Sequence, residues 1–185
     1  MTLEEIQDFK GKYPKQLWYL FTVEMWERFC FYGMRGVLTF FMVDQLLLKE
    51  DAANLQYGAI QAFVYAFTFI GGIFADKVLG FKKSLFFGGI VMILGNLLIA
   101  FSPIGTGFFK PNISSMVGEL YDEKDPRRDA GYGMFYAGIN IGGFLGGILC
   151  IYLGKFYSWQ LCFLSAAIVM IAGLLTFMFT KKHLG

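Results

Sequence analysis

The sequence predicts an all-α integral membrane protein with six transmembrane helices. Of its 185 residues, 56% are hydrophobic and only 16% are charged, whereas a soluble domain has about 25% charged residues. An aromatic share of 19% together with the low charge excludes a disordered chain. The formal net charge of +2 is too small to suggest nucleic-acid binding. We therefore expect a lipid bilayer, and no nucleic acid, among the partners.

Six apolar stretches, separated by charges and turn residues, define the expected helices. They cover residues 17–47, 53–78, 84–101, 104–120, 130–153 and 158–180. The first exceeds the roughly 20 residues that a crossing needs, so we expect it to tilt or protrude. The third and fourth belong to one continuous apolar stretch that must turn back near Ser102 and Pro103. That turn leaves a short hairpin of about 17 residues per helix.

The basic residues predict the orientation in the membrane. Eleven of the 16 Lys and Arg residues fall on one side of the six spans and two on the other, and the richer side is normally cytoplasmic. We expect a multi-pass protein of the cytoplasmic membrane with both termini in the cytoplasm. Its expected parts are a cytoplasmic segment at 1–16, a six-helix bundle at 17–180 and a cytoplasmic end at 181–185.

Five ionisable residues lie inside the expected spans, where each costs at least about 2.5 kcal/mol at the bilayer centre. They are Glu24, Glu27, Arg28, Arg35 and Lys110. On a helix that turns about 100° per residue, the four on the first span share an arc of about 140° with Tyr32. Ionisable residues at such depth usually line a path for ions or substrates.

Two interpretations of these charges remain open. In the first, Glu24 and Arg28 neutralise one another as a pair four residues apart, which leaves Glu27 and Arg35 without local partners. In the second, the carboxylates and cations share a water-accessible cavity, where Lys110 pairs with Glu24 or Glu27 until that carboxylate is protonated. Because an uncompensated buried charge is strongly unfavourable, such a pair would convert proton binding into helix movement.

The fifth span carries a stripe of small residues. Gly138, Gly142 and Gly146 recur every four residues, a pattern that lets helices pack backbone to backbone in membranes. Asn140 lies in the same segment, and Tyr65 offers a hydroxyl within the second span. Each of these two polar side chains either bonds a neighbouring helix or contacts a ligand.

The sequence indicates neither a metal centre nor a catalytic one. Cys30, Cys150 and Cys162 lack the spacing of a metal site or a disulfide framework, so we expect small buried or lipid-facing hydrophobes. No nucleophile–base pair or metal-ligand cluster accompanies Glu24 and Glu27, which argues against an intramembrane enzyme.

Four motifs follow one another along the chain. They are EMWERFCFYG at 24–33, GGIFADKVLGFKK at 71–83, GTGFFKPN at 105–112 and the segment 128–140 from RDAG to IN. In this order they resemble the proton-dependent oligopeptide transporter family of the major facilitator superfamily, over nearly the whole chain. The resemblance implies the N-terminal half of the facilitator fold, with two inverted three-helix repeats and a C-terminal six-helix half as partner.

The same resemblance implies proton-coupled symport of di- and tripeptides, with protons as the coupling ion and no other cofactor. It implies proton coupling by Glu24, Glu27 and Lys110, and a gating role for Asp76 near a helix end. The residues that it implies in peptide binding are Arg28, Tyr32, Arg35, Tyr65, Lys110 and Asn140.

Two other functions remain open. A non-transporting membrane bundle that scaffolds a partner would co-purify with a second six-span chain without binding peptides. A related symporter would carry another small anionic or zwitterionic solute, such as nitrate or an amino acid, because relatives of this scaffold vary in substrate.

Overall fold

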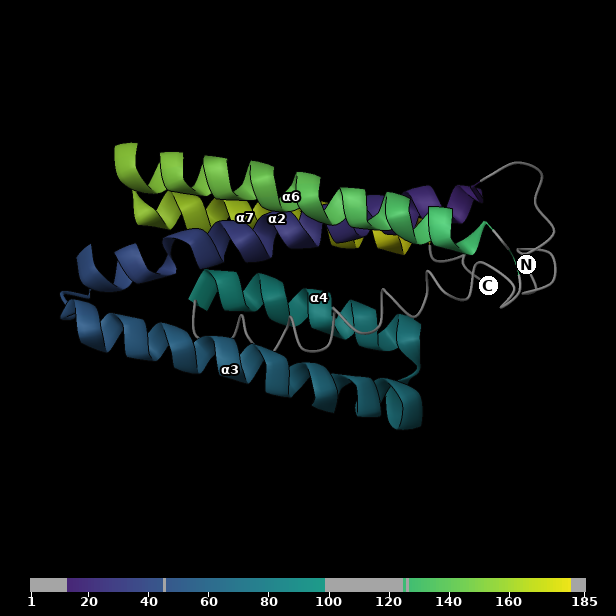
Figure 1. The fold of residues 1–185 in the computed structure, drawn as a ribbon, viewed down its shortest axis with the longest axis horizontal. Coiled ribbons are helices and arrows are strands. Elements are labelled where there is room, and N and C mark those ends of the chain that lie inside the picture. The colour runs from purple at the N-terminus through teal and green to yellow at the C-terminus, as the bar shows by residue number, and fades with distance from the viewer. Residues whose placement is uncertain (1–12, 45, 99–124, 126, 181–185) are drawn as a thin grey trace.

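The computed structural model describes residues 13–44, 46–98, 125 and 127–180, which form helices and short connections without a strand. The helices run side by side in a bundle (Figure 1). They are α2 (Lys15–Asp44), α3 (Glu50–Phe74), the π-helical turn η1 (Ala75–Leu79), α4 (Phe81–Leu98), α6 (Arg128–Phe156) and α7 (Trp159–Thr180). Five of the six expected spans therefore coincide with a helix, whereas the fourth, 104–120, lies outside the described residues.

Three stretches in the described part of the chain are long and apolar enough to cross a membrane. They are Glu50–Leu79, Arg128–Phe156 and Trp159–Thr180. Helix α2 has 30 residues, so it is longer than either Arg128–Phe156 or Trp159–Thr180. Four ionisable side chains, however, interrupt its middle. The all-helical class is thus confirmed, with three stretches able to span a membrane, while the number of crossings stays a prediction.

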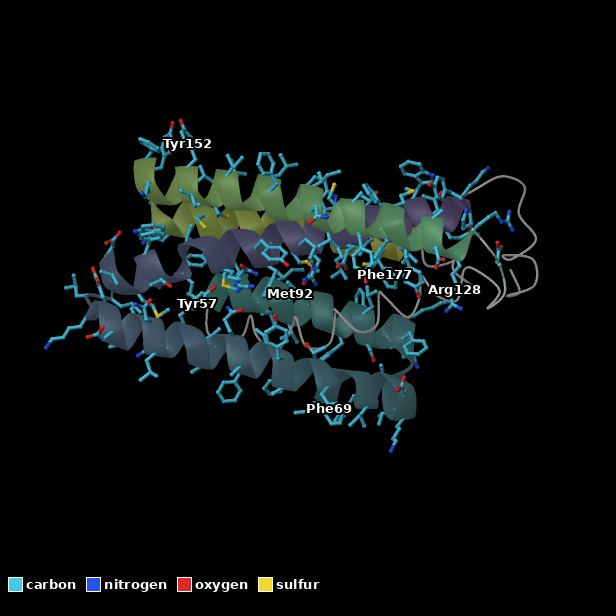
Figure 2. The ribbon with its side chains drawn as sticks, in the orientation of Figure 1. Tyr57, Phe69, Met92, Arg128, Tyr152 and Phe177 are labelled. Atoms are coloured by element: carbon cyan, nitrogen blue, oxygen red, sulfur yellow. The ribbon has the colours of Figure 1, made fainter. Side chains whose placement is uncertain are left out.

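Helix α2 occupies the middle of the bundle. It packs along α6 and α7, and α4 packs against α7, whereas α3 lies at the edge with few contacts to α2 (Figure 1). The side chains of α2 are accordingly buried along most of its length, from Leu17 to Met42. On α3, large apolar side chains such as Phe69 point away from the bundle (Figure 2). Apolar surface of this kind suits contact with lipid tails or with further helices.

The glycine stripe of α6 packs closely against another helix, as predicted, and that helix is α2. A Cβ atom on Gly138 would lie 2.9 Å from the ring of Phe21. On Gly142 or Gly146 it would overlap the backbone carbonyl oxygen of Met25 or Phe29. Only glycine lets the two backbones approach so closely.

The expected cysteine behaviour is also confirmed. Cys30, Cys150 and Cys162 are all free and buried. The Cys150 thiol lies 3.8 Å from the backbone oxygen of Cys162, which places α6 against α7 at this level. These side chains fill small gaps between helices, as weakly polar groups commonly do.

The connections follow ordinary backbone chemistry. Helix α3 begins with Glu50 and Asp51 in its first turn, where negative charge favours the helix dipole. Gly80 separates η1 from α4 at φ +75°, a left-handed conformation that glycine adopts without steric cost. Before α6, Arg127 donates hydrogen bonds to the Asp125 carboxylate from its backbone and its guanidinium, which lowers the pKa of that carboxyl.

Candidate functional site

Helix α2 buries two carboxylates and one guanidinium at neighbouring positions. Glu24, Glu27 and Arg28 are 2%, 0% and 2% exposed. The Nε atom of Arg28 lies 2.9 Å from Oε1 of Glu24 and also forms an ion pair with Glu27. Charges withdrawn from water are tolerated only when they are paired. When both acids are ionised, this cluster carries one more negative than positive charge.

The expectation that Glu27 lacks a local partner is wrong. Side chains on a helix tilt toward its N-terminus, so the long Arg28 side chain passes over the turn that carries both acids. Its guanidinium reaches Glu24, four residues earlier, and also its chain neighbour Glu27. The simple pairing of Glu24 with Arg28 is therefore only part of the arrangement.

The cluster is closed to solvent, and α6 covers its Arg28 side. A Cβ atom on Gly142 would lie 3.1 Å from Cβ of Arg28, so the glycine stripe brings the α6 backbone directly over this part of α2. The guanidinium carbon of Arg28 also lies 5.5 Å from the centre of the Phe31 ring. A water-accessible cavity was one expectation for these charges, whereas this conformation shields them. Exchange of a proton with water therefore requires the cluster to open.

Arg35, seven residues after Arg28, has different surroundings. It is partly exposed, and its Nε donates a 2.7 Å hydrogen bond to the hydroxyl of Tyr57 on α3. Tyr32 and Tyr65 lie within electrostatic range of the same guanidinium. Among the described residues, no carboxylate forms an ion pair with Arg35. In the described part of the chain, the guanidinium is thus paired with a hydroxyl group and not with a carboxylate.

Tyr32 and Asn140 line one depression between α2 and α6. Its volume is about 280 Å³, and Ile139, Gly143 and Phe144 complete the lining. The ring of Tyr32 would lie 3.0 Å from a Cβ on Gly143, so a glycine makes room for it. The amide nitrogen of Asn140 donates to the backbone oxygen of Tyr136 at 3.0 Å, one helical turn earlier. Two of the predicted binding residues therefore meet on one open surface.

The remaining predicted residues are dispersed. Tyr65 is 62% exposed on α3, close enough to interact electrostatically with Arg35. Asp76 is exposed in η1, the widened turn at the end of α3. Lys110, predicted for both proton coupling and binding, lies outside the described residues.

Two polar residues of the bundle were not predicted from the sequence. Tyr57 accepts a hydrogen bond from Arg35. Its position eight residues before Tyr65 on the same apolar helix was the sequence signal that could have identified it. Asn96 is buried in α4, where its amide nitrogen lies 3.0 Å from the Cys30 sulfur and 2.9 Å from the Met92 backbone oxygen. The sequence signal that could have identified Asn96 was an amide side chain within an apolar span.

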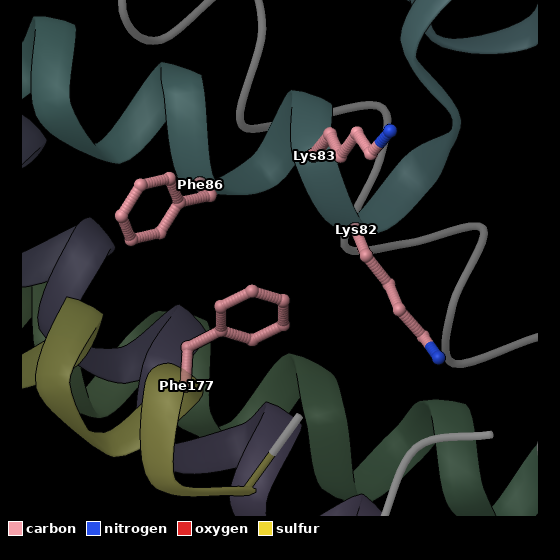
Figure 3. Close-up of a pocket in the computed structure, with 4 residues that line it drawn as sticks. All are labelled: Lys82, Lys83, Phe86 and Phe177. Carbon is pink, nitrogen blue, oxygen red and sulfur yellow. The ribbon is translucent and has the colours of Figure 1, made fainter. Parts of the chain in front are cut away.

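A separate cavity of about 310 Å³ lies between α4 and α7, remote from Tyr32 and Asn140. Phe86 and Phe177 face one another across it, while Lys82 and Lys83 extend away from the two rings (Figure 3). In the described ranges, no three His, Cys, Asp or Glu side chains are arranged to hold a metal ion. The chemistry that the predicted site offers is therefore proton exchange and charge or hydrogen-bond recognition.

Ionisable groups buried among helices this apolar are typical of membrane proteins that move ions or solutes. The family model described as the POT family (PTR2) matches residues 57–184. The chain belongs to the POT family. Members of this family are transporters and not enzymes.

Individual relatives agree with the family match. The uncharacterized transporter YclF of Bacillus subtilis strain 168 is 39% identical over 94% of this chain and 39% of its own length. Dipeptide and tripeptide permease A of Serratia proteamaculans strain 568 is 34% identical over 92% of this chain and 37% of its own. The chain spans about two fifths of the length of these relatives.

Solved structures show the same arrangement of helices. A peptide transporter POT in complex with sulfate is 36% identical, with a TM-score of 0.92 over 100% of this chain and 42% of that one. A POT family transporter in complex with 5-aminolevulinic acid is 31% identical, with a TM-score of 0.93 over the same shares of the two chains. The fold of this chain is therefore that of the corresponding part of a POT transporter.

Proposed function

We propose that the full-length protein is a proton-coupled symporter of di- and tripeptides in the cytoplasmic membrane. The observation that carries this proposal is the buried cluster of Glu24, Glu27 and Arg28 in a chain of the POT family. Ionisable groups inside membrane helices usually serve an ion or substrate pathway. Relatives named as dipeptide and tripeptide permeases supply the substrate class.

In the proposed coupling, Lys110 and a proton alternately neutralise the same excess negative charge on Glu24 and Glu27. Glu24 and Glu27 together carry one negative charge more than Arg28 neutralises. In one state the ammonium of Lys110 balances the excess, and in the other a proton bound to a carboxylate removes it. Because an unbalanced buried charge is costly, the exchange favours different helix positions in the two states. Protons are then the coupling ion, and no other cofactor takes part.

In the proposed binding site, cations attract the carboxylate of the peptide while hydroxyl and amide groups orient it. Arg35 supports this role because its charge is partly exposed and unopposed by any carboxylate in the described ranges. The depression that Tyr32 and Asn140 share adds a donor and acceptor surface. The full proposed set is Arg28, Tyr32, Arg35, Tyr65, Lys110 and Asn140.

We also propose that this chain forms the N-terminal six-helix half, built from two inverted three-helix repeats. Facilitator-type transporters bind substrate between two such halves, which rock about the site. A length of about two fifths of the relatives supports a second bundle as partner. In this arrangement both termini of the chain lie in the cytoplasm, and Asp76 acts as a gate at the end of α3.

Transport by purified full-length protein in liposomes tests the proposal. With acidic medium outside, a radiolabelled dipeptide should accumulate inside above its external concentration, and a protonophore should abolish the accumulation. Uptake that ignores the proton gradient, or no uptake at all, would refute proton-coupled peptide symport. Residues 1–185 alone should give no uptake, and transport by that isolated chain would refute its role as a half.

A second candidate substrate class is a small zwitterionic solute. A structural relative holds 5-aminolevulinic acid, a molecule with an amine and a carboxylate, like a dipeptide. If this class is the true substrate, unlabelled 5-aminolevulinic acid should block uptake of labelled solute at lower concentration than any dipeptide does. Stronger competition by dipeptides would instead favour peptides.

A further inference from the structure

The hydrogen bond from Arg35 to Tyr57 connects two helices that otherwise make few contacts. It joins α2 to α3 across 22 positions of sequence, at 2.7 Å between Nε and the hydroxyl oxygen. Tyr57 lies between these helices at the end where they meet (Figure 2). On α3, the buried residues are only Ala53, Val64 and Gly71. Tyr57 also packs against the apolar core, so the bond adds a specific polar link where α3 buries few other residues.

The identity of the donor atom determines what the guanidinium can still bind. A guanidinium offers a carboxylate two forked faces, one formed by Nε with one Nη and one formed by both Nη atoms. In Arg35 the Nε hydrogen is already donated to Tyr57. The terminal face with both Nη atoms is the fork left for a second, anionic partner.

The identity of the acceptor matters equally. A tyrosine hydroxyl is neutral, so it fixes the direction of the guanidinium without neutralising its charge. Arg28 differs, because Glu24 and Glu27 already oppose its charge. On α2, Arg35 is thus the guanidinium whose charge remains available to an anion, and Tyr57 sets the direction that it faces.

We propose that Tyr57 is a positioning residue, which holds Arg35 so that its two terminal nitrogens face the carboxylate of the transported peptide. This inference rests on the proposed peptide transport. It assigns Tyr57 no contact with the peptide. Loss of the hydroxyl alone should therefore weaken recognition of the carboxylate while leaving the transport step intact.

The variant Tyr57→Phe in the full-length transporter removes only the hydroxyl. In liposomes, the KM for a labelled dipeptide should rise about 3- to 10-fold, the range expected for one lost hydrogen bond, with the maximal rate unchanged. Inhibition by the matching dipeptide amide, which lacks the carboxylate, should change less than about twofold.

In the background of Arg35→Lys, which has no Nε–H fork, the same tyrosine change should have no further effect. Tyr152→Phe, at an exposed tyrosine near the C-terminal end of α6, serves as the control and should leave KM unchanged.

Three results would overturn the inference. They are an unchanged KM in Tyr57→Phe, an equal loss of affinity for the dipeptide and its amide, and a full additional effect of Tyr57→Phe in the Arg35→Lys background. Failure of the proposed function gives a different result, because the parent protein itself would then take up no peptide and the inference would fall with it.

Discussion

Two arginines on one helix illustrate how surroundings determine the role of a side chain. Arg28 is buried between two carboxylates, whereas Arg35 is partly exposed and donates to a tyrosine hydroxyl. Breaking a buried ion pair leaves an uncompensated charge, which costs far more than losing a pair at the surface. Arg28 should therefore matter for the stability of the bundle, and Arg35 for the binding of ligands.

Replacing Arg28 by Met tests this difference. The variant removes the guanidinium that pairs with buried Glu24 and Glu27, so the free energy of unfolding of the full-length protein should fall by about 3–5 kcal/mol. The measurement is unfolding in mixed detergent micelles titrated with SDS near neutral pH. Arg127→Met is the control, because it removes a more exposed pair with Asp125 and should lower the free energy of unfolding much less. Equal losses in both variants would contradict a buried, stabilising cluster.

Part of this cluster follows from the sequence. The spacing of Glu24, Glu27 and Arg28 places the three residues near one another on a helix, which predicts a shared environment. It does not predict that one guanidinium serves both acids, because rules for helix surfaces pair residues three or four positions apart. The direction of the long Arg28 side chain decides that pairing, and the direction depends on the helix α6 that packs over it.

Helices α2 and α6 depend on glycine for their close contact. Gly142 and Gly146 face the α2 backbone, whereas a Cβ on Gly147 would meet no atom within 4 Å. In a membrane, helix association relies on van der Waals packing of this kind. The stripe therefore holds the two helices together and brings α6 against Arg28.

A matched pair of substitutions on α6 tests the contact. Gly142→Ala places a methyl group against the carbonyl of Met25, so it should destabilise the protein by about 1–3 kcal/mol through overpacking. Gly147→Ala meets open space and should stabilise the helix by about 0.5–1 kcal/mol, because alanine loses less backbone entropy. Thermal unfolding in detergent distinguishes the two. A neutral Gly142→Ala would rule out the tight helix contact.

At the scale of helices, apolar runs and small-residue spacing predict most of what the structure describes. The expected spans match α2, α3, α4, α6 and α7, and the stripe of α6 packs against another helix as predicted, although the sequence did not say which one. The π-helical turn η1 was not predicted, since its local hydrogen bonding leaves no mark in hydropathy. Tyr57 was not predicted as a partner of Arg35 because the contact depends on how α3 meets α2, and no periodic pattern records it.

The whole bundle is asymmetric around its central helix. Helix α2 contacts α6 and α7 along its length and carries the ionisable residues, whereas α3 at the edge exposes large apolar side chains. In the proposed transporter, a second bundle covers part of this exposed surface and completes the peptide site. The charged cluster then lies within one half, so that its protonation changes the position of α2 relative to its neighbours.

The most direct test of the central claim compares driven uptake with exchange in the full-length transporter. Glu27→Gln keeps the shape of the side chain but binds no proton, so dipeptide accumulation under a proton gradient should be lost. Exchange of labelled for unlabelled peptide without a gradient should persist, because binding and helix movement remain. Glu50→Gln, at an exposed acid in the first turn of α3, should accumulate peptide as the parent does. Undiminished proton-driven accumulation by Glu27→Gln would contradict coupling through the buried cluster.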